Sequence, residues 1–130
     1  MTLRPDEKAA LLKLAVRVTG GRARVISGAS SNATAEGAEL ARRAESAGVD
    51  AIIVTAPWYN RPSQDGVLRH FEYITGAVTC PIIVGDSPAR FCWDFEMATL
   101  ARLQKLPTVI GIADGCGRIA GATAIRRACP

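Results

Sequence analysis

Two hydrophobic patterns alternate along the chain: apolar residues at helical spacing, and short runs that are apolar at nearly every position. The first pattern predicts amphipathic helices, and the second predicts strands covered on both faces, which is typical of parallel sheets. The predicted strands cover residues 23–27, 51–55, 81–84 and 108–112. The predicted helices run from Pro5 to the glycine pair at 20–21 and over residues 34–47, 65–78, 94–104 and 118–127. We expect Asn32 or Thr34 to cap the second helix and Gly48 to end it.

The predicted strands are regularly spaced. Their starts fall near residues 24, 51, 81 and 109, so successive starts are separated by 27, 30 and 28 residues. This period indicates a repeated strand–helix unit, which fits either a (β/α) barrel or an open doubly wound sheet. The spacing by itself does not choose between the two. In both architectures ligands bind at the carboxyl ends of the strands.

Length, composition and charge narrow the class of protein. The chain has 130 residues, of which 48% are hydrophobic and 22% charged, so it can bury a core and is not a disordered tail. It has neither an apolar run long enough for a membrane span nor the apolar segment of a signal peptide, so we expect a cytoplasmic protein without a membrane partner. The net charge of +4 is spread along the chain rather than clustered, which argues against a nucleic-acid partner.

The four cysteines and the single histidine, His70, do not form a metal-binding pattern. Cys80, Cys92, Cys116 and Cys129 are dispersed and include no C-x-x-C pair. A structural zinc site uses closely spaced ligands, so we expect reduced thiols, no metal and no cofactor. We expect His70 on the surface of its helix rather than paired with Cys116 as a catalytic dyad.

Polar and charged residues gather where the predicted strands end, which is where a ligand would bind. Arg90 follows the third strand and offers a bidentate donor to a carboxylate; the alternative is a surface pair with Asp86 or Asp94. Tyr59 follows the second strand and is either a proton donor or relay, or an aromatic residue at a subunit contact. After the fourth strand, residues 115–117 (Gly-Cys-Gly) could form an anion-binding turn.

Four segments at these strand ends resemble the dihydrodipicolinate synthase/N-acetylneuraminate lyase family. They are ISGASSNAT, TAPWYNRPSQDGVLRHFEYI, PIIVGDSPAR and VIGIADGCG, and they are similar to family forms close to IAGTGSNAT, TPYYNKPSQEGLYRHF, PIILYNVPSRT and IVGIKEASG. The second segment is long and specific, and the four occur in the family's order and spacing over nearly the whole chain. The resemblance implies a (β/α)8 barrel that carries out class I aldolase chemistry with pyruvate.

The resemblance also implies roles for single residues. In the family a strand-end lysine forms a Schiff base with pyruvate, a tyrosine moves protons and an arginine holds a carboxylate. Arg90 stands at the arginine position. Tyr59 stands where a second tyrosine commonly reaches across a subunit interface to support the proton relay. The residues that match the family pattern without an implied catalytic role are Asn32, Thr34 and Pro62.

Two catalytic positions of the family are vacated in this sequence. Ala113 occupies the lysine position and Gly85 the tyrosine position, with Asp86 in place of the asparagine that follows. Alanine has no amine to condense with pyruvate, and the lysines at 8, 13 and 105 lie in or at the ends of predicted helices. The family's Gly-Thr-Thr-Gly-Glu motif is absent as well. We expect a lyase-family chain with impaired catalysis; the alternative is a non-catalytic fragment that binds an oxo acid or serves as a structural partner.

By the same resemblance, residues 1–130 form a single truncated barrel domain that supplies strands three to six. This predicts an α/β half-barrel of four parallel strands with flanking helices. The strands near residues 24 and 109 would then be open edges, which favour pairing with another chain. We expect a homo-oligomer in which two halves close one barrel, or pairing with a complete subunit, and a small oxo acid such as pyruvate as a weakly bound or lost ligand. A flavodoxin-like cofactor binder is a more distant alternative, because no phosphate loop is evident.

Overall fold

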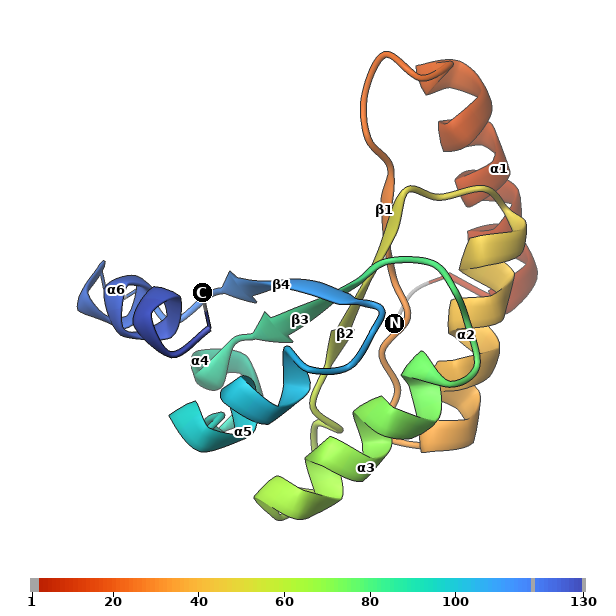
Figure 1. Cartoon of the computed structure of the whole chain (residues 1–130). Coiled ribbons are helices and arrows are strands. Elements are labelled where there is room, and N and C mark those ends of the chain that lie inside the picture. Colours follow the sequence, from red (N-terminus) through yellow and green to blue (C-terminus); the bar gives the residue numbers. More distant parts are fainter. Residues whose placement is uncertain (1–2, 118, 130) are drawn as a thin grey trace.

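The computed structural model describes residues 3–117 and 119–129 of the chain. In this part of the chain four parallel strands form one sheet in the order β1-β2-β3-β4, with helices between successive strands (Figure 1). The strands are β1 (Ile26–Gly28), β2 (Ala51–Thr55), β3 (Ile82–Asp86) and β4 (Val109–Asp114). The helices are α1 (Pro5–Thr19), α2 (Thr34–Ser46), α3 (Gln64–Thr75), α4 (Pro88–Phe91), α5 (Met97–Leu103) and α6 (Ile119–Ala128).

The strand order decides between the two architectures that the spacing left open. Each strand pairs with the strand that precedes it in the sequence, whereas the strand order of a doubly wound sheet reverses part-way. The helices α1, α2, α3 and α5 follow one another along the sheet, and each contacts the next (Figure 1). This is the arrangement of a (β/α) barrel, so the predicted half-barrel is confirmed.

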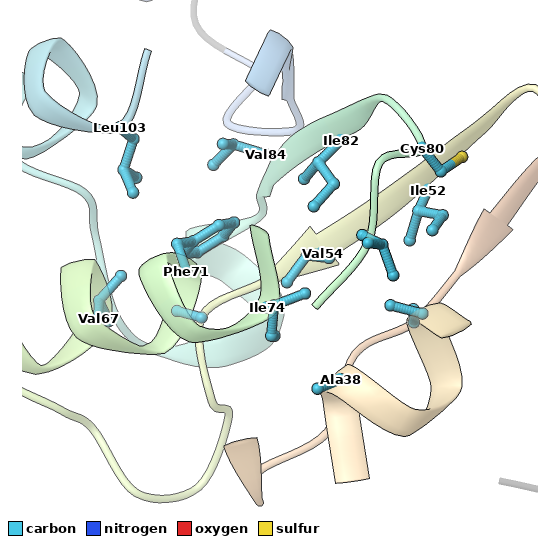
Figure 2. Close-up of a cluster of buried hydrophobic side chains, with 14 of the residues drawn as sticks. Ala38, Ile52, Val54, Val67, Phe71, Ile74, Cys80, Ile82, Val84 and Leu103 are labelled. Carbon is cyan, nitrogen blue, oxygen red and sulfur yellow. The ribbon is translucent and has the colours of Figure 1, made fainter. Parts of the chain in front are cut away.

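The hydrophobic core lies between the sheet and this layer of helices. The strand residues that are fully buried in it are Ile52, Val54, Ile82 and Val84. They pack with Phe71 and Ile74 of α3 and Leu103 of α5 (Figure 2). Ile53 and Ile83 alternate with them and are only partly buried, because they point to the opposite face, which is the interior side of a barrel. Among the described residues, no helix is both long enough and apolar enough to cross a lipid bilayer.

The start of α2 differs from the prediction. Its N-cap residue is Ala33, which has no side-chain acceptor, rather than Asn32 or Thr34. Ser31 partly replaces the missing cap, because its Oγ accepts a hydrogen bond from the N–H of Ala33 at 3.1 Å. The Thr34 hydroxyl lies within hydrogen-bond distance of His70 instead, 2.8 Å from Nδ1. Thr34, which the local sequence pattern suggested as the cap, is therefore used in a tertiary contact with His70.

The strands β3 and β4 each extend two residues beyond their predicted ends. Their ladder continues because Gly85 is partnered with Ala113 and Asp86 with Asp114. The prediction ended each strand where the apolar run ended, and these last residues are small or polar. The extension matters because it puts Gly85 and Ala113 inside the sheet rather than on loops.

Other boundaries shift by a few residues. β1 begins at Ile26 rather than at residue 23, α3 ends at Thr75 rather than at 78, and α5 begins at Met97 rather than at 94. α4 is a single helical turn where a loop was predicted. The predicted start of the last helix, Arg118, lies outside the described residues.

The outer strands of the sheet are open edges in the described part of the chain. β1 pairs with β2 alone and β4 pairs with β3 alone. Ile26 of β1 is 53% exposed and Ile110 of β4 is 63% exposed, so each edge strand has a large apolar side chain that the described chain leaves uncovered. The predicted exposure of the two edges is therefore confirmed.

Candidate functional site

Gly85 and Ala113, which stand where the resemblance implies a tyrosine and a lysine, lie side by side at the carboxyl end of the sheet. In the parallel register, Thr55 of β2 is partnered with Gly85 of β3, which is partnered with Ala113 of β4. A Cβ atom at position 85 would lie 2.9 Å from Cγ2 of Thr55 and 3.2 Å from Cγ1 of Ile53, so these β2 side chains close over the glycine. Gly85 is buried and Ala113 is exposed. This row of strand ends therefore offers neither an amine nor a phenol.

Tyr59 and Arg90 line one hollow beyond the ends of β2 and β3. Its volume is about 350 Å³, and its walls come from the loop after β2 and from α4 with the residue that follows it. The lining residues are Trp58, Tyr59, Arg61, Arg90, Phe91 and Cys92. Tyr59 is 89% exposed, so its hydroxyl is accessible from outside the chain. The structure thus brings together the two site residues that the sequence placed on separate strand ends.

Arg90 is available for a ligand. Within the described part of the chain its guanidinium makes no salt bridge, so the alternative pairing with Asp86 or Asp94 does not form. The side chain is exposed, at the third position of α4. An exposed, uncompensated guanidinium can present its planar donor fork to a carboxylate.

Hydrogen bonds join the loop after β2 to the segment after α4, on either side of the hollow. The indole N–H of Trp93 donates a hydrogen bond to the carbonyl of Pro62 at 2.6 Å. The Gln64 amide donates to the carbonyl of Asp94 at 2.9 Å and accepts from the N–H of Glu96 at 3.3 Å. These contacts join segments about thirty positions apart in the sequence, so the hollow has a defined frame.

Backbone strain is concentrated at this hollow. Among the described residues, three that are not glycine have a left-handed backbone: Tyr59 at φ 66°, Arg61 at φ 42° and Cys92 at φ 49°. All three line the hollow. Such conformations persist only where surrounding contacts hold them, and they are enriched at functional sites. Sequence reasoning did not find Arg61 or Cys92, because backbone conformation is not visible in residue types.

The residues that match the family pattern without a catalytic role make structural contacts. The carbonyl of Asn32 accepts a hydrogen bond from the Asn60 side chain at 3.1 Å. Thr34 contacts His70, and the Pro62 carbonyl binds Trp93. None of the three lines the hollow; the Pro62 contact ties the two loops around it, whereas Thr34 joins α2 to α3.

Asp86, Asp114 and Cys116 form a cluster that sequence reasoning did not find. One oxygen or sulfur atom from each lies within 4.8 Å of the others, and the Cys116 thiol is 3.5 Å from Oδ2 of Asp86. The cluster depends on the register that sets Asp86 opposite Asp114, which requires the strands to extend beyond their apolar runs. Two carboxylates and a thiol are ligand types that a divalent cation accepts, so a metal ion, if any, would bind the described residues here.

The turn after β4, a candidate anion-binding turn by sequence, uses two of its backbone N–H groups in hydrogen bonds within the chain. The N–H of Gly115 donates to the carbonyl of Asp86 at 2.7 Å, and the N–H of Cys116 donates to Oδ1 of Asp114 at 2.8 Å. Two of the N–H groups that would bind an anion are therefore already occupied. A Cβ on Gly115 would lie 2.6 Å from Oγ of Ser87. The ends of β3 and β4 approach so closely here that only glycine fits.

His70 is buried, and the prediction of a surface histidine is wrong. It is 3% exposed, on the same face of α3 as Val67, Phe71 and Ile74. Its Nδ1 contacts Thr34, while Nε2 has no hydrogen-bond partner within the described structure. Burial lowers the pKa of His70 to about 4, so the ring is neutral at physiological pH. It packs in the core and takes no part in the hollow.

The fold and the hollow together define a class of protein: part of a (β/α) barrel with a hollow at the carboxyl ends of its strands, where barrels bind their ligands. A family model described as the dihydrodipicolinate synthetase family matches residues 1–130, and the chain belongs to this family.

Relatives and solved structures agree with this assignment. The chain is 42% identical over 118 residues to the 4-hydroxy-tetrahydrodipicolinate synthase of Acidiphilium cryptum, covering 91% of the chain and 40% of that enzyme. It is 43% identical over 129 residues to that of Rhizobium meliloti, covering 98% of the chain and 44% of the enzyme. The dihydrodipicolinate synthase structure from Bacillus anthracis has a TM-score of 0.95 and 33% identity, and the match covers 99% of the chain and 44% of that structure. The chain therefore spans less than half the length of the relatives it matches.

Proposed function

We propose that this chain binds a small 2-oxo acid such as pyruvate through Arg90 but does not form the Schiff base on which the family's chemistry depends. The observation that carries the proposal is the register in which Ala113 lies beside Gly85. An amine is required because only its condensation with the oxo group gives an iminium that withdraws electrons from the neighbouring carbon. Neither side chain of this strand-end pair can supply that amine or move a proton.

The other lysines do not offer a replacement. Lys8 and Lys13 lie on α1, and Lys105 follows α5, so none of them is at the carboxyl end of a strand or in the lining of the hollow. Arg90 and Tyr59 line the same hollow, which supports binding without turnover. Tyr59 would contact the bound acid or a neighbouring subunit through its exposed hydroxyl.

Borohydride trapping tests the loss of Schiff-base chemistry. The chain is incubated with pyruvate and borohydride and examined by intact-mass spectrometry, with a complete family enzyme that has the lysine as the positive control. We expect the control to gain the mass of the reduced pyruvate adduct and this chain to gain none. A pyruvate adduct on this chain would overturn the proposal, and peptide mapping would identify the lysine responsible.

Calorimetric titration tests binding. Pyruvate should bind the unmodified chain weakly, bind the Arg90→Ala variant more weakly still, and bind the Arg69→Ala variant as it binds the parent. Arg69 is the matched control because it is an exposed arginine on α3 that does not line the hollow. If Arg90→Ala and the parent bind pyruvate equally, Arg90 is not the carboxylate-binding residue.

A second candidate function is that of a structural partner. The exposed isoleucines on both open edges favour it, because an edge strand offers unpaired backbone groups to another chain. We propose that β4 of one copy pairs with β1 of another, so that two four-stranded sheets close. Sedimentation should then give a dimer at micromolar concentration, whereas a stable, well-folded monomer would contradict the pairing.

A further inference from the structure

Half of the residues that line the hollow are aromatic, namely Trp58, Tyr59 and Phe91. Trp58 and Phe91 are partly buried, yet neither belongs to the hydrophobic core or to the apolar side chains packed against it. The contacts between aromatic rings in the described part of the chain involve other residues. The hollow therefore has an aromatic wall that the fold does not use to pack its own core.

Two of these rings stand where the family forms have hydroxyl side chains. Trp58 occupies the position of the first tyrosine in TPYYN, and Phe91 occupies the position of the threonine that follows PSR. A phenylalanine side chain has no polar atom, and the indole of tryptophan can only donate a hydrogen bond. The two differences replace hydroxyl groups with larger aromatic surface. A ligand group that touches this wall is therefore bound by apolar and aromatic contact rather than by hydrogen bonds.

The aromatic wall is held in place without a ligand. Cys92, which follows Phe91, ends α4 with a left-handed backbone (φ 49°). The next residue, Trp93, donates its indole N–H to the carbonyl of Pro62 and so holds this segment against the loop that carries Trp58. Because the two sides of the wall are already joined, a ligand does not have to order them when it binds.

We infer that Trp58 and Phe91 make the hollow selective for a 2-oxo acid with an aromatic side group. The inference rests on the proposed function, in which Arg90 binds the carboxylate end, and it names the group at the other end of the ligand. An aromatic side group gains ring-to-ring contacts with this wall in addition to the burial of apolar area, whereas an aliphatic group gains burial alone. The hollow has a volume of about 350 Å³, which is within the range of small-molecule pockets and leaves room for a phenyl ring beside the oxo acid.

The test compares three acids that share the oxo-carboxylate end and differ in the side group: pyruvate, 4-methyl-2-oxopentanoate and phenylpyruvate. Each is titrated calorimetrically into the full chain. We expect phenylpyruvate to bind about tenfold more tightly than pyruvate, with the aliphatic acid between them. Added salt should weaken all three acids but leave the ratio between them unchanged, because salt screens the charge of the carboxylate and not apolar contact.

Substitutions in the wall should remove the preference and leave the affinity for pyruvate unchanged. Phe91→Leu keeps an apolar side chain without a ring, so it should lower the preference for phenylpyruvate over the aliphatic acid. Phe91→Thr, which introduces the family residue, should lower it further, and Trp58→Leu should act in the same direction. Tyr73→Leu is the matched control, since Tyr73 is an exposed aromatic residue on α3 that does not line the hollow. Circular dichroism verifies that each variant is folded.

Arg90→Ala separates this inference from the proposed function. It should weaken all three acids by a similar factor and leave the preference for phenylpyruvate in place. If the parent binds the three acids equally, or if the preference survives the combined Phe91→Thr and Trp58→Leu variant, the inference is wrong, and the proposed function still stands provided that Arg90→Ala weakens pyruvate binding. If Arg90→Ala leaves pyruvate binding unchanged, the proposed function fails instead. If none of the acids binds the parent, both fail.

Discussion

At the scale of the residue, His70 links the stability of the fold to pH. Its folded pKa of about 4 lies below the ordinary value of 6.5, so the unfolded chain binds the proton more readily. Protonation would put a second N–H on a buried ring whose Nε2 has no acceptor within the described structure. The stabilisation from the neutral ring is therefore complete above about pH 6.5 and is lost as the pH falls towards 4. Between about pH 7.5 and pH 5 we expect the free energy of unfolding to fall by about 2 kcal/mol from this residue.

Urea unfolding of the parent and of His70→Gln at these two pH values measures the effect. The parent should lose more stability than the variant, because glutamine does not titrate. The comparison goes no lower than pH 5 so that Glu45 and Asp50 stay ionised; hydrogen bonds from Thr79 and Val25, respectively, lower their pKa values. Equal losses in both proteins would show that His70 does not carry the pH dependence.

Residue types alone were enough to propose Arg90 and Tyr59, because charged and aromatic residues after apolar strands are few and their place in a barrel is known in advance. The prediction of a surface His70 was wrong although the sequence held the signal for its burial, since Val67, Phe71 and Ile74 recur around it at helical spacing. The place of Arg61 in the hollow was not readable, because it depends on a left-handed backbone and on a loop that the hydrogen bond from Trp93 to the Pro62 carbonyl holds from about thirty residues away.

At the scale of the element, side chains of β2 pack against Gly85 of β3 and leave no room for a larger residue. We predict that Gly85→Ala destabilises the fold by about 1–3 kcal/mol, because its Cβ would meet Cγ2 of Thr55 at 2.9 Å. Thr55→Ser removes that methyl group, so the double variant should recover part of the loss. Gly111→Ala is the control: Gly111 lies in β4 with nothing within 4 Å of its Cβ position, and its change should stay within about 0.5 kcal/mol. Thermal or urea unfolding of the parent and the three variants measures the free energy of unfolding. An unchanged free energy for Gly85→Ala would show that the side chains of β2 move aside without loss of stability.

The helices and strands were predicted well where the apolar pattern determines them. Their ends were predicted poorly where tertiary contacts determine them. All four strands and the long helices follow from hydrophobic periodicity. The strand ends at Asp86 and Asp114 do not, because their ladder is maintained by a neighbouring strand rather than by their own residue types. The same limit applies to α2, where Thr34 contacts His70 and leaves the cap position to Ala33.

At the scale of the whole molecule, the arc of four strands leaves the barrel-interior face and two edges without partners in the described chain. The spacing of the strands predicted a repeat but not its curvature. The sheet curves because its strands pair in sequential order and its helices cover one face. In a barrel of this curvature, each edge strand would pair with a further strand.

This geometry gives a prediction about assembly through β4. The pairing between β3 and β4 shifts register after Ile82, so Ile110 falls outside the ladder and projects outward at 63% exposure. We predict that Ile110→Lys converts the proposed dimer to a monomer, because a lysine on an edge strand opposes pairing with another strand. Tyr73→Lys is the matched control, since Tyr73 is 56% exposed on α3, away from both edges, and should leave the dimer intact. Sedimentation velocity over a concentration series distinguishes these outcomes, with circular dichroism to verify folding. A folded Ile110→Lys protein that remains dimeric would exclude β4 as the pairing edge.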